Sequence, residues 1–330
     1  MNRQNIISLL FGILLLLSLA AGCADTGMTA PEDEQPEEVD GPSTEARSAD
    51  LPDAERNTPQ TIAPVAGKLT VTRVFETKFE TKTYPVRIEV NGSIYAGAKN
   101  VNKGLPHGVD WDDTEVMTAY YRRFIEDPAM TVFFDDIVRG LRSVKEREGF
   151  NDNEYLEFLI TFVQQIPYDP AAKAHPRYPV EVVWEQMGDC DEKSLLLIGL
   201  LAHEGYDTAF ILFPDEHHAA AGIRISTGTT PSFRIFEGPE TGKYFYIEST
   251  RPTYIGLYTR PFESAEAFVV PIGEGSGRFN QVNYICRITG TFQKIEERLP
   301  FMHDRMKEWE TEIADLERRL TAGDYESRAE

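Results

Sequence analysis

The chain has 330 residues, with 33 Lys or Arg against 54 Asp or Glu, so its formal net charge is −21. Hydrophobic residues make up 41% of the sequence, which is enough for a packed core and excludes a wholly disordered chain. The acidic balance disfavours nucleic-acid binding, because a negative surface repels phosphate backbones. The cysteines Cys23, Cys190 and Cys286 are too few for a disulfide scaffold.

Residues 1–22 have the pattern of an export signal. Arg3 supplies a positive charge, residues 6–19 form an apolar run, and small residues precede Cys23. An ordinary signal peptide or a short uncleaved anchor has the same run. The five residues that end at Cys23 also resemble the bacterial lipobox, although Ala20 stands where that pattern prefers Leu. We therefore expect an exported lipoprotein that is anchored through lipid on Cys23 and faces the extracytoplasmic side.

Residues 23–66 are typical of a tether. From residue 24 onward this stretch has no aromatic residue, and it contains eleven Asp or Glu, two Arg and six Pro. Such a segment buries too little apolar area to offset the entropy of ordering it. We expect it to be disordered and extended.

A folded body is predicted from residue 67 to residue 295. It starts with alternating apolar and polar residues, which predict strands at 68–75 and 84–90, and Asn91-Gly92 is a turn signal. Helices are expected next, at residues 115–126, 131–148 and 152–165. A long loop then begins at Ile166-Pro167.

The most apolar segment of the body is residues 191–203, which we expect to form a buried central helix. It is far too short to span a bilayer. Strands are predicted after it, at residues 208–213, 219–225, 233–236, 244–248, 267–271 and 282–288. Helices followed by strands predict an α+β domain whose sheet packs on this helix.

Residues 296–330 are expected to form an amphipathic helix. Apolar residues step along it by four and three, at Met302, Met306, Trp309, Ile313, Leu316 and Leu320. Docking of this helix on the body and self-association as a short coiled coil both fit the spacing.

Cys190 is the candidate nucleophile. It stands just ahead of the predicted buried helix, where unpaired N–H groups and the helix dipole favour an anion such as a thiolate. Gly188 lets the backbone turn sharply into that helix. The acidic residues on both sides oppose a low thiol pKa, so a nearby base is needed. Taken alone, a cysteine in this position is more often a buried core residue than a nucleophile.

A base and an acid follow in the right order. His217 and His218 stand at the start of a predicted strand, and Glu248 lies at the end of another. A nucleophile at a helix N-terminus, a base on one strand and an acid on a second strand form a Cys–His–acid arrangement.

These residues belong to a series of motifs that resembles the prokaryotic transglutaminase-like superfamily. The motifs are Phe162-Val-Gln-Gln-Ile-Pro-Tyr168, Tyr178-Pro-Val-Glu181, Gly188-Asp-Cys-Asp-Glu-Lys-Ser194, Leu200-Leu-Ala-His-Glu-Gly-Tyr-Asp207, His218-Ala-Ala-Ala-Gly222 and Tyr246-Ile-Glu-Ser-Thr250. The resemblance covers about residues 68–261 and is strongest from 164 to 250. It implies a papain-like core with a central buried helix on an antiparallel sheet.

The resemblance also implies roles. Cys190 would be the nucleophile, His218 rather than His217 the base, Glu248 the acid, and Gln164 an oxyanion donor beside the Cys190 N–H. The implied reaction is acyl transfer from a protein or peptide amide through a thioester, without a cofactor. Water as acceptor gives a peptidase or amidase, and an amine gives a transglutaminase. The tryptophan that follows the cysteine in animal transglutaminases is missing here, which disfavours protein cross-linking.

Three other interpretations stay open at this point. His217 and His218 beside acidic residues suggest a metal site, although no second ligand cluster has a suitable spacing. A disulfide between Cys190 and Cys286, formed in an oxidising compartment, would remove the nucleophile. The chain would also fit an inactive surface protein that binds or scaffolds other molecules.

Overall fold

The computed structural model describes residues 60–104, 114–171, 173–225, 234–238, 242–257, 262, 264–275 and 304–319. All of them lie in one of two compact units of the chain, Pro52–Glu330. The predicted export signal, Cys23, nearly all of the tether, Cys286 and the strand expected at 282–288 lie outside the described residues.

A two-stranded hairpin opens the body. It consists of β1 (Thr70–Phe79) and β2 (Lys82–Asn91), which pair antiparallel, so both predicted strands are confirmed and are longer than expected. The predicted turn at Asn91-Gly92 is wrong. The Asn91 side chain instead accepts a hydrogen bond from the Ser93 N–H and caps α3 (Gly92–Asn100), because Asn suits helix N-caps as well as turns.

The packed region begins earlier than predicted. Ile62 is buried, and its N–H donates to the Asp127 carboxylate at 2.8 Å. The tether therefore ends before this residue and not at residue 66. Asp127 also caps α5 (Pro128–Glu148) through the Ala129 N–H, which is why that helix starts three residues before the predicted position.

The other predicted helices of the body are confirmed. They are α4 (Thr114–Glu126), α6 (Asp152–Gln164) and α8 (Cys190–His203). In the middle of α8, a Cβ on Gly199 would lie 2.0 Å from the Phe134 ring of α5, so only glycine permits this approach. Two helices were missed. One is α3, where a turn was expected, and the other is α7 (Pro179–Glu185), a short segment within the expected loop.

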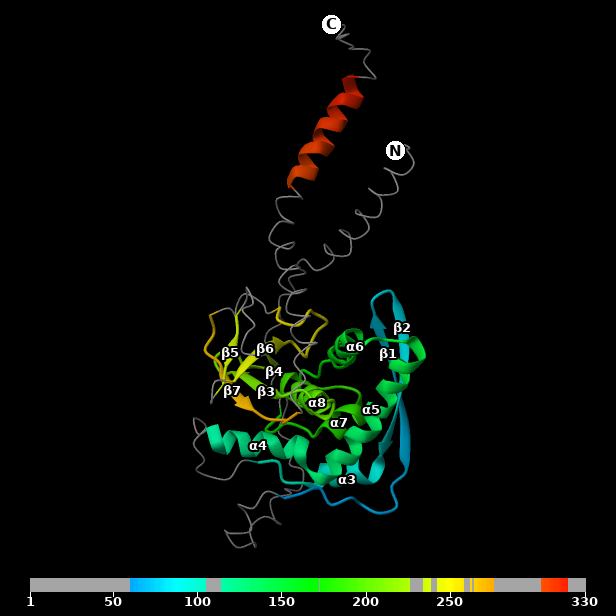
Figure 1. The fold of residues 1–330 in the computed structure, drawn as a ribbon, viewed down its shortest axis with the longest axis vertical. Coiled ribbons are helices and arrows are strands. Elements are labelled where there is room, and N and C mark those ends of the chain that lie inside the picture. Colours follow the sequence, from blue (N-terminus) through cyan, green and yellow to red (C-terminus); the bar gives the residue numbers. More distant parts are fainter. Residues whose placement is uncertain are drawn as a thin grey trace, which may run out of the picture. The chain divides into compact units, whose positions relative to one another are not determined.

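The sheet is antiparallel, with strand order β5-β6-β4-β3-β7 (Figure 1). Its strands are β3 (Thr208–Phe213), β4 (His218–Arg224), β5 (Phe236–Glu237), β6 (Lys243–Ile247) and β7 (Phe268–Pro271). Alternate residues such as Ala219, Ala221 and Phe245 share one core cluster with the apolar residues of α8. Tyr246 and Phe213 belong to a second cluster. The described body is thus an α+β fold with a buried helix on its sheet.

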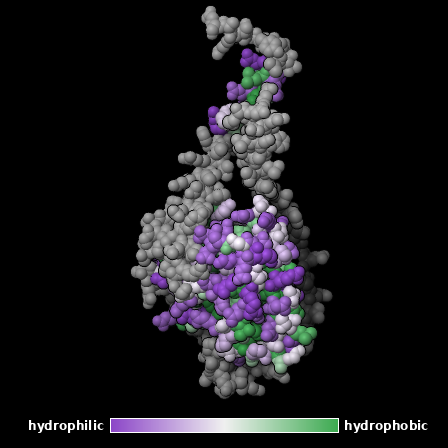
Figure 2. All heavy atoms as spheres, turned by 45° about the vertical axis from the view of Figure 1, so that its right-hand side comes forward, coloured by the Kyte–Doolittle hydropathy of each residue, from purple (hydrophilic) through white to green (hydrophobic). Residues whose placement is uncertain are grey.

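Residues 304–319 are helical, within the predicted amphipathic segment. Three residues of its apolar seam, Trp309, Ile313 and Leu316, are each about half exposed at 53%, 55% and 53%. None of the helices in the described part of the chain is both long and apolar enough to cross a bilayer. The face of the protein drawn in Figure 2 is mainly hydrophilic, with small hydrophobic patches between the polar side chains.

Candidate active site

Local hydrogen bonds place Cys190 at the first position of α8. The Asp189 side chain accepts from the Glu192 N–H at 3.1 Å, and the Glu192 side chain accepts from the Asp189 N–H at 3.0 Å. This capping box satisfies two of the main-chain donors near the helix start. Residues 186–189, between α7 and α8, are here called the Cys190 loop. In this loop the Gly188 N–H donates to the Pro167 carbonyl at 3.1 Å, which joins the loop to the segment after α6.

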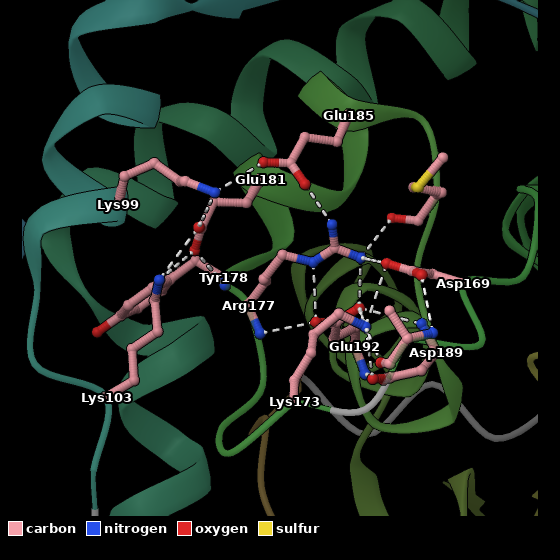
Figure 3. A network of polar contacts seen from close by, with 12 residues as sticks. Lys99, Lys103, Asp169, Lys173, Arg177, Tyr178, Glu181, Glu185, Asp189 and Glu192 are labelled. Atoms are coloured by element: carbon pink, nitrogen blue, oxygen red, sulfur yellow. Dashed lines mark hydrogen bonds and ion pairs between the residues drawn. The ribbon is translucent and has the colours of Figure 1, made fainter. Parts of the chain in front are cut away.

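A buried ionic network holds this loop (Figure 3). Glu192 is fully buried, and it accepts from Nε and Nη2 of Arg177 at 2.8 and 2.7 Å. The guanidinium also reaches Asp169, Glu185 and the carbonyl of Met187. Lys173 pairs with Asp169 at 3.2 Å and with Asp189 at 3.0 Å. Because one cation links α7, α8 and the segment after α6, the position of Cys190 is set by buried charges.

The Cys190 thiol is held in its protonated form. Its Sγ donates to Asp191 Oδ1 at 3.5 Å. Burial raises the pKa of the thiol to about 12, with a further increase from the charges of Asp191 and Asp189, although a main-chain hydrogen bond from Ala219 opposes them. Burial and the charge of Asp189 also raise the pKa of Asp191 to about 6. A resting thiolate, which the helix N-terminus was expected to favour, is therefore not the form that this arrangement stabilises.

The predicted base and acid form a direct pair. His218 Nε2 lies 3.3 Å from Glu248 Oε2 and 3.2 Å from the Tyr246 hydroxyl, which itself donates to the same carboxylate oxygen at 2.7 Å. The other oxygen, Oε1, accepts from the Thr250 N–H at 2.9 Å and hydroxyl at 2.7 Å. Burial alone would raise the pKa of Glu248, but His218 and Thr250 together lower it to about 2.

This pairing assigns the two nitrogens of the His218 ring. An ionised carboxylate only accepts hydrogen bonds, so Nε2 is the donor to Glu248. In the neutral ring, Nδ1 is then the basic nitrogen. Phe262 stacks on the ring with centroids 4.8 Å apart. His217 precedes His218 at a φ of 49°, in the left-handed region, and ends the turn between β3 and β4.

The nucleophile and the base–acid pair approach each other through neighbouring residues. Ala219, next to His218, hydrogen-bonds to the Cys190 sulfur through its main chain. Ser249, next to Glu248, donates to the Cys190 carbonyl at 3.5 Å. The hydroxyls of Ser249 and Ser194 lie 2.9 Å apart, which ties α8 to the end of β6. Among the described residues, no hydrogen bond joins the Cys190 thiol to His218.

Gln164 lies at the end of α6 and is buried. Its Nε2 donates to the main-chain carbonyls of Glu248 at 2.9 Å and Thr253 at 3.0 Å. Both amide hydrogens are thus engaged, and the predicted oxyanion role would require one of them to be released. In this arrangement Gln164 supports the segment that carries Glu248.

Several residues that shape the site were not predicted, among them Tyr246 and Arg177, whereas the unfavourable effect of Asp191 on the thiol was expected. Tyr246 stands two positions before Glu248, and residues two apart in a strand share a face. The spacing could therefore have indicated that the Tyr246 hydroxyl lies on the side of Glu248. Arg177 lies in an expected loop, and no local pattern links it to Glu192. Cys190 is a free cysteine, and Cys286 lies outside the described residues. The described residues contain no cluster of three His, Cys, Asp or Glu able to hold a metal.

No family model matches the chain, and no curated protein matches it. Among solved structures, LapG of Legionella pneumophila in its calcium-bound form is similar at 14% sequence identity, covering 55% of this chain and 99% of that one, with a TM-score of 0.25. A likeness at this level carries no argument about function.

Proposed function

We propose that this protein is a cysteine-dependent acyl-transfer enzyme that acts on amide bonds of proteins or peptides and has a transglutaminase-like core. The observation that carries the proposal is the ionised Glu248 paired with His218. Ala219, which follows His218, and Ser249, which follows Glu248, both contact Cys190. A base oriented by a carboxylate and placed beside a thiol is the arrangement that nucleophilic catalysis requires.

The high pKa of the Cys190 thiol determines how the first step would proceed. Sγ attacks the amide carbonyl while His218 Nδ1 takes the thiol proton, so no stable thiolate forms before substrate binds. Glu248 stabilises the resulting imidazolium through Nε2. The C–N bond then breaks as the imidazolium returns its proton to the leaving amine, and the acyl group stays on Cys190 as a thioester.

The second step is the reverse chemistry with a new acceptor. Water or an amine attacks the thioester carbon while His218 takes a proton from the attacking molecule. The imidazolium then returns this proton to the Cys190 sulfur, which leaves as a thiol. Main-chain N–H groups at the start of α8 are the donors that would stabilise the oxyanion in both steps. Hydrolysis would make the protein a peptidase or amidase, and aminolysis a transglutaminase-type enzyme.

The proposal includes the site of action. Lipid on Cys23 and the acidic tether would display the domain on the extracytoplasmic side of a membrane, and the helix at 304–319 would support self-association through its exposed seam. The second candidate is an inactive binding or scaffold protein. The protonated thiol and its contact with Asp191 favour that alternative, whereas the complete His218–Glu248 pair argues against it.

Trapping of the thioester tests the proposal. The wild-type domain and a Cys190→Ser variant are incubated with an unfolded protein digest and quenched in acid, and the peptide that contains residue 190 is analysed by mass spectrometry. In the wild type we expect acyl groups on Cys190 that hydroxylamine removes. In Cys190→Ser we expect no hydroxylamine-sensitive acyl group at residue 190. Lack of such additions in the wild-type protein, with the variant and wild type equally folded, would support the scaffold interpretation.

A further inference from the structure

Lys193 is a buried cation that the mechanism above does not use. It lies one turn after Cys190 in α8 and has no exposed surface. Its ammonium donates to the main-chain carbonyls of Ile166 at 2.6 Å, Gln164 at 3.1 Å and Thr250 at 3.3 Å. A buried charge is strongly unfavourable unless its donors are satisfied, and here three acceptors match the three N–H groups.

The three carbonyls belong to the segments that hold the base–acid pair. Gln164 is the last residue of α6, and Ile166 follows two positions later. Thr250 lies in the segment 248–255 after β6, here called the Glu248 strap. Thr250 binds Glu248 Oε1 through both its N–H and its hydroxyl. The Gln164 amide binds the strap at the Glu248 and Thr253 carbonyls. Lys193 therefore connects the helix of the nucleophile to the strap of the acid.

The charge on Lys193 depends on its surroundings. Burial lowers the pKa of Lys193 to about 8, and the charge of Glu248 opposes that decrease. The groups that α6 and the strap present to the ammonium are the main-chain carbonyls of Gln164, Ile166 and Thr250. A neutral amine has two N–H groups and cannot serve three carbonyls, so loss of the proton removes one link.

We propose that Lys193 is a positioning residue, whose ammonium fixes the Glu248 strap against α8 and thereby sets the base–acid pair relative to Cys190. The role rests on the proposed function for its effect on chemistry, whereas the strap contact itself can be measured without any turnover. Above the pKa of Lys193 the strap loosens, and the reactivity of Cys190 toward electrophiles falls with it.

Hydrogen exchange of the full chain tests the contact. In Lys193→Met, peptides from the strap should exchange about tenfold faster than in the wild type, while peptides from α5 keep their rate. Lys145→Met is the matched control, because the Lys145 ammonium pairs with Asp152 and lies over the Tyr155 ring, both in α6. Unchanged protection of the strap in a folded Lys193→Met protein would overturn the proposal.

Two further measurements separate the possible failures. Alkylation of Cys190 by iodoacetamide is followed from pH 7 to 9.5, and its His218-dependent part is the rate that is lost when His218 is replaced by Ala. In the wild type this part should disappear above pH 8. In Lys193→Met it should be absent at all these pH values. A loosened strap with unchanged alkylation would contradict a positioning role. If Lys193→Met does not fold, strap exchange in the wild type decides, since constant protection from pH 7 to 9.5 would overturn the inference. A loosened strap in a protein that forms no acyl adduct would refute the proposed function alone.

Discussion

The two halves of the candidate site are built in opposite ways. The base half is an ionised Glu248 carboxylate that lies 3.3 Å from the His218 imidazole and accepts a 2.7 Å hydrogen bond from the Tyr246 hydroxyl. The nucleophile half, Cys190 with Asp191, holds a neutral thiol next to a carboxylate. One half is organised to accept a proton and the other to keep one.

The difference shows which electrostatic effect prevails at the start of α8. A helix N-terminus stabilises an anion by about 0.3–1 kcal/mol, which is less than one pKa unit. Burial and the charges of Asp191 and Asp189 act in the other direction and raise the pKa of the Cys190 thiol from 9.0 to about 12. The position of a cysteine at a helix start is therefore not sufficient to predict a thiolate, and the proposed mechanism relies on His218 to activate the thiol.

The largest effect should follow from breaking the base half. His218→Ala removes the proton acceptor, and we expect the rate of acyl addition to Cys190 to fall about 10³–10⁴-fold. His217→Asn is the matched control, because His217 is exposed and Asn tolerates its positive φ. Equal losses in both variants, measured by mass spectrometry under the same conditions, would contradict a specific role of His218.

The next largest effect concerns the scaffold of the nucleophile half. Arg177→Met leaves Glu192 buried without its main cation, which should lower the free energy of unfolding by about 3–5 kcal/mol. Arg139→Met removes a surface pair with Asp136 and should cost less than about 1 kcal/mol. Urea unfolding measures both changes. A loss for Arg177→Met no greater than that of the control would mean that the network does not hold the Cys190 loop.

Acid should weaken the base half in a defined range of pH. The pKa of Glu248 is lowered in the folded protein to about 2 from its ordinary value of 4.5, so its contribution to stability is present above pH 4.5 and is lost as pH falls toward 2. A shift of this size corresponds to roughly 3 kcal/mol. The difference in urea midpoint between the wild type and Glu248→Gln should shrink across that range. A difference that stays constant from pH 5 to pH 2.5 would show that Glu248 is not stabilised as a carboxylate.

The smallest expected effect is a gain. Asp191→Asn removes one negative charge beside the sulfur, which should lower the pKa of the Cys190 thiol and raise its alkylation rate at pH 8 by about tenfold for each pKa unit. Asp136→Asn, on the surface of α5, is the control. A slower reaction in Asp191→Asn would indicate that this carboxylate assists the thiol.

The sequence was sufficient for features that depend on local pattern. The apolar run after Cys190 predicted a buried helix, and alternation predicted both strands of the N-terminal hairpin. The order of the motifs and their resemblance to a known family selected His218 and Glu248, which do form a pair. The helix and the hairpin follow from residues near each other in the chain, where periodicity and capping determine the structure.

Other features depend on distant residues and left no local signal. Arg177 meets Glu192 only because α7 folds against α8, and α7 is too short to show helical periodicity. Gln164 has the side chain expected of an oxyanion donor, but the strap carbonyls engage its amide. The state of the thiol was also not evident, because burial is a property of the folded protein and opposes what the helix start favours.

The pH dependence of Cys190 alkylation tests the central claim most directly. The claim is that His218, oriented by Glu248, removes the proton from a thiol that is otherwise too weak an acid to react at neutral pH. For the wild-type domain with iodoacetamide, the account predicts a reaction at pH 7–8 that is far faster than that of His218→Ala, whose rate should rise only in strong alkali. Identical pH profiles for the two proteins would contradict it.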